Sequence, residues 1–177
     1  MELYKYTPLS AAKNIRLLRL HPGIPGSALK CELREVGLDE YEYEAVSYCW
    51  GDSSLVSHIE CDDKKIPITK SCAEVLQRFQ LKKKHRILWI DGICIDQSSK
   101  REVEQQVQLM GELYEGAFRT LIWLGRGTKT TDVICKHLKK IGPLNPEGED
   151  NPSALPPLKR FWFSLYNRQL LRDHGKC

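Results

Sequence analysis

The chain has 177 residues, of which 41% are hydrophobic and 28% are charged, so it is long enough to bury a core without disulfide staples. Its formal net charge of +4 is too small to indicate a dedicated nucleic-acid binder. The apolar runs are short, which excludes a predicted membrane span. We therefore expect one globular domain, or one domain with a ragged end, that binds neither nucleic acid nor membrane.

Seven cysteines are present, and no two of them are separated by two residues. Zinc sites and redox motifs need such close pairs, and the five histidines show no metal-ligand spacing either. No metal site is predicted. The N-terminus lacks a basic patch followed by an apolar stretch, so no secretory signal is predicted. Reduced cysteines and the missing signal together indicate a cytoplasmic protein.

The first two predicted elements form a β pair. Residues 15–20 mix apolar and basic side chains, and residues 29–36 alternate with period two, as half-buried strands do. Prolines and glycines between Pro22 and Gly26 supply the turn. We assign this pair to an N-terminal β extension that covers residues 1–42.

Residues 43–51 predict a buried strand that ends in a tight turn at Gly51. Residues 58–61 and 65–68 flank a turn-rich triplet and predict a hairpin. Pro67 cannot donate a hydrogen bond to a neighbouring strand, so the hairpin is expected at an edge of the sheet.

Ser71 and Glu74 match a capping box and predict the start of a helix with a regular apolar stripe. The helix is expected to end in the basic run of residues 82–86, because positive charge is favourable near a helix C-terminus. A nucleic-acid site in this run is the alternative that we consider less favoured.

Residues 87–91 predict a buried strand that ends in Asp91. Ser99 and Glu102 form a second capping box before a helix of about four turns, and residues 120–125 predict one more strand. Alternating strands and helices indicate an α/β fold with a mostly parallel sheet flanked by helices.

The remaining chain is divided by composition. Residues 129–141 predict a further helix, which closes a core domain of residues 43–141. Residues 142–157 contain five prolines and read as a flexible loop. Residues 158–177 form a C-terminal segment that opens apolar and ends polar.

Ligands bind beyond the carboxyl ends of strands in an open parallel sheet, and three segments should meet there: residues 47–52, 91–97 and 125–127. Asp91 and Asp96 could act as acid and base or hold a hydroxylated ligand. The alternative, that both aspartates cap turns, is favoured by composition. Glu102 is either a site carboxylate or a helix cap, and Gln106 shares its helix face.

Trp50 and Cys49, which lie at the end of the same predicted strand, are two further candidates for a functional role. Trp50 could stack on a planar ligand, although tryptophan in such a run is more often core. Cys49 has no evident histidine partner and is a poor candidate nucleophile.

Three blocks in order resemble the heterokaryon-incompatibility (HET) domain family of filamentous fungi. They are residues 43–52 (YEAVSYCWGD within the strand and turn), residues 88–97 (LWIDGICIDQ), and a third block that runs from Glu102 through residues 114–117 to residues 122–125. The N-terminal segments 6–9 and 15–18 also look like the sequence that usually precedes this domain. The resemblance implies a fungal signalling protein in non-self recognition and programmed cell death, which associates with itself or with another incompatibility protein.

The HET fold is thought to be TIR-like, a flavodoxin-like α/β arrangement, and some TIR domains cleave NAD with a glutamate. The resemblance therefore implies NAD as a possible substrate, with Asp91, Asp96 and Glu102 as candidate catalytic residues and no certain cofactor. Departures from the family pattern include Val103, where members often carry arginine, and a C-terminal segment without the expected glutamate. Besides a signalling module and an NAD-cleaving enzyme, a third possibility is therefore that the protein is an inactive, truncated remnant. Further members of the functional patch are Ser47, Tyr48, Trp50, Gly51, Gln97 and Gln106.

Overall fold

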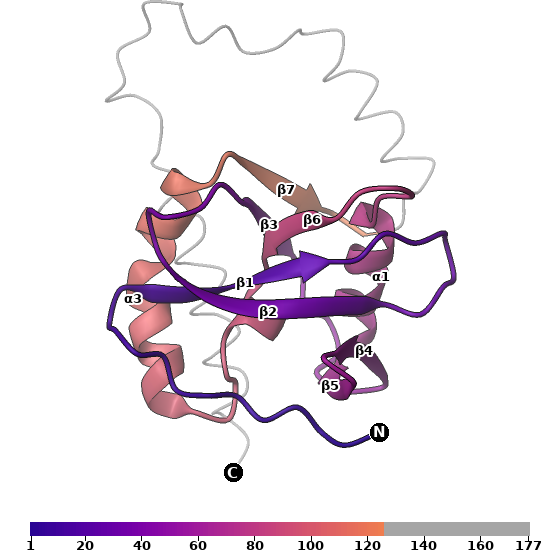
Figure 1. The fold of residues 1–177 in the computed structure, drawn as a ribbon, viewed down its shortest axis with the longest axis horizontal. Coiled ribbons are helices and arrows are strands. Elements are labelled where there is room, and N and C mark those ends of the chain that lie inside the picture. The colour runs from indigo at the N-terminus through magenta and orange to yellow at the C-terminus, as the bar shows by residue number, and fades with distance from the viewer. Residues whose placement is uncertain (126–177) are drawn as a thin grey trace, which may run out of the picture. The chain divides into compact units, whose positions relative to one another are not determined.

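The structure is a computed structural model that describes residues 1–125, and these form one seven-stranded sheet with three helices (Figure 1). The predicted helix at 129–141, the loop at 142–157 and the C-terminal segment at 158–177 lie outside the described residues. The elements, in chain order, are β1 (Asn14–Leu20), β2 (Lys30–Gly37), β3 (Glu44–Tyr48), β4 (Ser57–Cys61), β5 (Lys64–Ile68), α1 (Lys70–Phe79), β6 (Arg86–Trp89), α2 (Asp91–Cys94), α3 (Lys100–Gly116) and β7 (Arg119–Trp123).

The sheet is mixed, with the strand order β5-β4-β2-β1-β6-β3-β7. Strands β6, β3 and β7 run parallel to one another, and β2 is parallel to β4. The pairs β1–β2, β1–β6 and β4–β5 are antiparallel. The fold is therefore α/β as predicted, but the sheet is not mostly parallel. The reason is the position of β1, which runs antiparallel to both of its neighbours.

Strand β1 lies between β2 and β6, with Leu18 opposite Leu88. The N-terminal β pair is present as predicted, and it supplies two strands to the same sheet as the strands of the predicted core domain. The edge hairpin is present as well, because β5 is the outer strand and carries Pro67 opposite His58. Asp62 and Asp63 close this hairpin with positive φ angles of 48° and 60°, the geometry of the tightest hairpin turns.

Helices α1 and α3 cover opposite faces of the sheet. Arg86 of β6 donates a hydrogen bond to the carbonyl oxygen of Phe79 in α1, whereas Trp89 of the same strand packs edge-to-face on Tyr114 of α3. Residues 86 and 89 point to opposite faces because side chains alternate along a strand. Figure 1 shows α3 and α1 at opposite sides of the strands.

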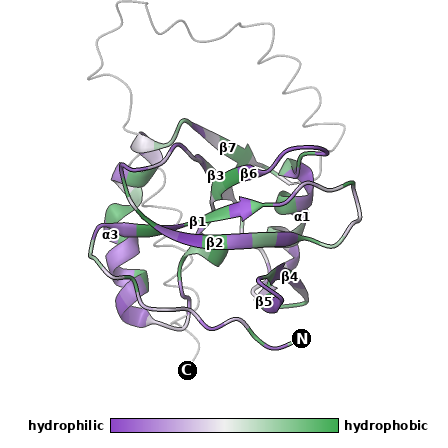
Figure 2. Cartoon of the chain, in the orientation of Figure 1, coloured by the Kyte–Doolittle hydropathy of each residue, from purple (hydrophilic) through white to green (hydrophobic). Residues whose placement is uncertain are grey.

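The apolar stripe of α1 faces the core, with Cys72, Val75 and Leu76 buried as the sequence pattern predicts. Figure 2 shows the same separation for the whole unit, since hydrophobic colour gathers on β3 and β6 while the exposed turns of α3 are hydrophilic. No helix within residues 1–125 is long and apolar enough to cross a membrane.

The two ends of α1 differ from the prediction. Thr69, not Ser71, is the N-cap, and its hydroxyl accepts a hydrogen bond from the Cys72 amide at 3.2 Å. The helix ends at Phe79, before the basic run that was expected to form its last turn. The prediction that Ser71 is the N-cap was wrong, because Thr69, two residues earlier, offers the same kind of hydroxyl.

Candidate functional site at the sheet edge

The carboxyl ends of β3, β6 and β7 lie at one edge of the sheet because these strands are parallel neighbours. Two of the predicted segments meet there directly. The Trp50 indole nitrogen, just beyond β3, donates a hydrogen bond of 3.0 Å to Oδ2 of Asp91, which follows β6. Gly51 makes the intervening turn possible, since its φ of +65° lies in the left-handed region that side chains with a Cβ rarely adopt.

Asp91 is buried and opens α2, a short helix that the sequence analysis did not predict. Its Oδ1 accepts a hydrogen bond from the Gly92 amide at 2.7 Å. Burial raises the pKa of Asp91 to about 6, although the hydrogen bond from Trp50 favours the charged form. No cation within residues 1–125 forms an ion pair with this carboxylate. Asp91 is thus a buried carboxyl group with a raised pKa beside an indole ring.

Tyr48 and Gln97 complete this cluster. A Cβ at position 92 would lie 2.7 Å from the Tyr48 hydroxyl oxygen, so the absence of a side chain on Gly92 makes room for the phenol. Burial raises the pKa of Tyr48, and the nearby charge of Asp91 raises it further. The Gln97 amide nitrogen donates to the Asp91 carbonyl oxygen at 2.9 Å. We call Tyr48, Trp50, Asp91 and Gln97 the Asp91 cluster.

Ser47 is buried in β3 opposite Ile122, on the face of the strand that Tyr48 does not share. None of the hydrogen bonds formed among the described residues joins Ser47 to Asp91. Burial raises the pKa of Cys72 to about 12, so its thiol stays protonated near neutral pH. Cys49 is exposed.

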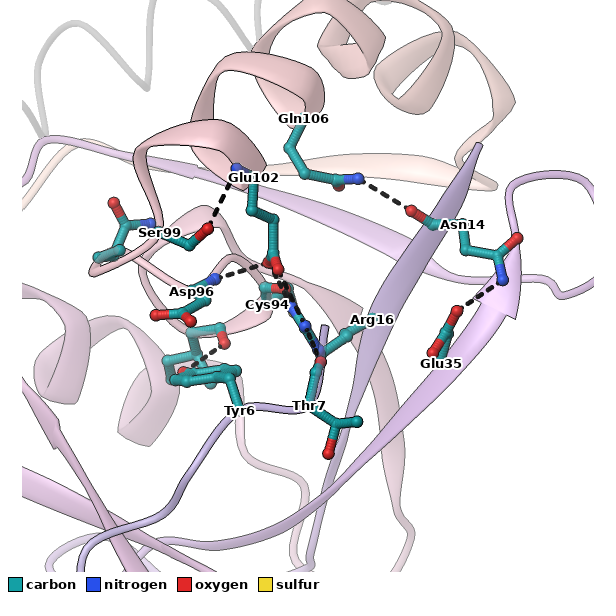
Figure 3. A network of polar contacts seen from close by, with 12 residues as sticks. Tyr6, Thr7, Asn14, Arg16, Glu35, Cys94, Asp96, Ser99, Glu102 and Gln106 are labelled. Atoms are coloured by element: carbon teal, nitrogen blue, oxygen red, sulfur yellow. Dashed lines mark hydrogen bonds and ion pairs between the residues drawn. The ribbon is translucent and has the colours of Figure 1, made fainter. Parts of the chain in front are cut away.

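Glu102 belongs to a second polar cluster, built around Arg16 of β1 (Figure 3). The Arg16 guanidinium forms a bidentate ion pair with the Glu102 carboxylate, and the two side chains are only 5% and 8% exposed. Arg16 also donates to the carbonyl oxygens of Cys94 at 3.2 Å and Thr7 at 2.6 Å. In Figure 3 the Arg16 guanidinium and the Glu102 carboxylate point toward one another, and each of the Arg16 hydrogen bonds described above goes to a protein oxygen, which indicates a structural role for this pair.

The same carboxylate accepts a hydrogen bond from the Asp96 amide at 2.8 Å, and the Ser99 hydroxyl caps α3 by accepting from the Glu102 amide at 3.3 Å. Ser99 is therefore the N-cap, as predicted. The Glu102 side chain does not complete the capping box, because it binds Arg16 and the Asp96 amide.

Asp96 forms a turn with Ser98, whose amide and hydroxyl donate to Asp96 Oδ1 at 3.0 Å and 2.6 Å. Gln106, one turn along α3 from Glu102, donates from its amide nitrogen to the Asn14 carbonyl oxygen at 2.8 Å. The structure thus brings Asp91 together with Trp50, Tyr48 and Gln97. It places the Asp96 and Glu102 carboxylates in contacts of their own.

Arg16 was missed by sequence reasoning, although it is the partner of Glu102. Its signal is a single basic residue that keeps strand period with Leu18 and Leu20, two buried positions of β1. A buried arginine needs an acidic partner. The sequence alone does not show which carboxylate that partner is, because the choice of Glu102 depends on the fold.

No group of three or more metal-ligating side chains gathers within the described part of the chain. The family model described as heterokaryon incompatibility protein (HET) matches residues 43–170. The chain belongs to the HET family.

Among curated proteins, this HET chain is similar to heterokaryon incompatibility protein 6, OR allele, of Neurospora crassa. The identity is 31% over 144 residues, which cover 73% of this chain and 21% of the relative. The chain therefore spans about a fifth of the length of that protein. No solved structure is significantly similar to the chain. The TIR-like relationship of this HET fold stays a prediction.

Proposed function

We propose that this HET domain is a signalling module of fungal non-self recognition that promotes cell death by associating with itself or with another incompatibility protein. The family match across residues 43–170 supports the process, as does the similarity to a curated Neurospora protein named for heterokaryon incompatibility. The proposal that the domain acts by association, and not by catalysis, rests on the contacts that the carboxylates of Asp96 and Glu102 make.

The observation that favours association over catalysis is the buried ion pair of Arg16 and Glu102. A carboxylate that stabilises an oxocarbenium-like state must face the substrate. Glu102 instead faces a guanidinium and a backbone amide, and Asp96 Oδ1 is taken up by a turn. Two of the three predicted catalytic carboxylates therefore have structural partners.

NAD cleavage is the second candidate, and Asp91 is the residue that favours it. This carboxyl group lies at the carboxyl end of β6, has no cationic partner among residues 1–125, and is ionised for the most part at neutral pH with a pKa of about 6. Its neighbour Trp50 has an indole ring that could stack on nicotinamide.

One experiment separates the two candidates. The chain and its Asp91→Asn variant are expressed from an inducible promoter in a filamentous fungus, and growth arrest and nicotinamide release are measured together. We expect growth arrest for both proteins, with NAD intact. If the wild type both arrested growth and released nicotinamide, and Asp91→Asn did neither, NAD cleavage would be established. No arrest with well-expressed wild-type protein would refute the signalling role.

A further inference from the structure

Residues 82–85 lie in the loop that connects α1 to β6, and Arg86, the last residue of the basic run, is the first residue of β6. Lys82, Lys83 and Lys84 are exposed, and none of them forms an ion pair within the described residues. The loop is nevertheless held in place. The Leu81 carbonyl oxygen accepts a hydrogen bond from the Gly23 amide at 2.9 Å, and Arg86 donates to the Phe79 carbonyl oxygen at 2.9 Å. The loop therefore holds three exposed lysines whose charges are not paired with any acidic side chain among residues 1–125.

A surface depression of about 310 Å³ lies beside this loop, at the amino ends of β3, β6 and β7 and thus at the opposite end of these strands from the Asp91 cluster. Its apolar wall includes Leu81, Ile87 and Phe118. Phe118 is 65% exposed and Leu81 is 40% exposed. An exposed phenylalanine in a hollow offers apolar area that water now covers.

The charged wall of the depression contains two guanidinium groups for one shared carboxylate. Glu44 forms ion pairs with both Arg86 and Arg119. Arg86 and Glu44 are largely covered, whereas the Arg119 side chain is 57% exposed and lies over the Phe118 ring at 5.8 Å. Arg119 can therefore accept a further carboxylate, since a guanidinium has five donors and Glu44 uses few of them.

We propose that the depression and the basic loop form a docking surface for an acidic peptide segment of a partner protein. An apolar side chain of that segment packs on Leu81 and Phe118, one carboxylate binds Arg119, and further acidic residues lie along Lys82–Lys84. This inference rests on the proposed function, for which it supplies the chemistry of the partner. Aromatic and arginine side chains such as Phe118 and Arg119 are enriched at protein interfaces relative to the rest of the surface.

An acidic peptide fits this surface better than a phosphate backbone does. Glu42 and Glu44 also line the depression, and their carboxylates would repel a continuous row of phosphates. Including the loop, five permanent cations oppose these two carboxylates, so the surface remains positive overall. A segment with interspersed apolar and acidic residues satisfies both walls.

The test uses the full chain and a fluorescent peptide in which glutamates flank a central phenylalanine, with binding measured by anisotropy. We expect Arg119→Glu to weaken binding at least about tenfold, which corresponds to the loss of one interface anchor. Lys83→Glu should weaken it about threefold without touching an ion pair of the fold. The matched control is Arg101→Glu, an exposed position in the first turn of α3, which should bind as the wild type does. Raising salt from about 50 to about 500 mM should weaken wild-type binding strongly.

Equal binding by the wild type, Arg119→Glu and Lys83→Glu would overturn the proposal, and so would no binding by a wild-type chain that is folded by circular dichroism. A single-stranded oligonucleotide or phosphatidylserine vesicles that bind more tightly than the peptide would overturn the partner class. The growth-arrest assay reports separately on the signalling role. Growth arrest without peptide binding would refute only the docking surface. Peptide binding without growth arrest would refute only the proposed signalling function.

Discussion

The Arg16–Glu102 ion pair gives the sharpest test of the structure, through the substitution Glu102→Gln. The variant keeps the size of the side chain but leaves the Arg16 guanidinium buried without its counter-charge. Breaking a buried pair in this way costs about 3–5 kcal/mol, because the remaining charge has lost both its partner and its water. We expect a loss of about 4 kcal/mol in the free energy of unfolding and a fall in Tm of roughly 15 °C for a domain of this size.

Urea denaturation followed by circular dichroism measures this loss, and Glu112→Gln is the matched control. Glu112 lies on the same helix and pairs with Lys13, but the two side chains are 56% and 73% exposed. That exposed pair should contribute less than about 1 kcal/mol. If Glu102→Gln cost no more than Glu112→Gln, Glu102 would not be a structural residue, and its assignment as a catalytic carboxylate would regain support.

Three further predictions are tested by the same denaturation assay. Because the pKa of Asp91 is raised to about 6, its charge destabilises the fold as pH rises from about 3 to 7, so the wild type should lose about 3 kcal/mol relative to Asp91→Asn over that range. A pH-independent difference would contradict the buried carboxylate. Gly92→Ala should cost about 1–3 kcal/mol by meeting a tyrosine hydroxyl, whereas Gly111→Ala, with nothing within 4 Å, should stabilise α3 by up to about 1 kcal/mol. Thr69→Ala should cost about 1 kcal/mol and Ser71→Ala much less, and the reverse order would restore the predicted cap.

Most strand and helix positions were predictable because the longer elements have a local pattern, whereas the four-residue helix α2 has none. The apolar run before Asp91 and the stripe of α1 are examples, and both elements are present. The strand order was less accessible. Nothing in residues 14–20 states that this strand inserts beside β6, since that pairing depends on residues about 70 positions away.

The candidate site was predictable only in its location. Parallel strand ends indicated the edge at which Trp50 meets Asp91. The partner of Glu102 was not predicted, because an ion pair between β1 and α3 is a tertiary contact without a spacing rule. A capping-box match at Ser99 offered a local role for the glutamate and so concealed its long-range role.

The central place of β1 also decides where the folding unit begins. The family match starts at residue 43, but a fragment cut there would lack both strands that join β4 to β6. The remaining strands would separate into an isolated hairpin and a three-stranded piece, each with newly unpaired backbone amides and carbonyls. During synthesis, β1 and β2 can pair early, yet β1 gains its second neighbour only after residue 89 has been made. The sheet of this domain is therefore complete only after β6 and β7 have been made, and any expression boundary must include residues 14–37.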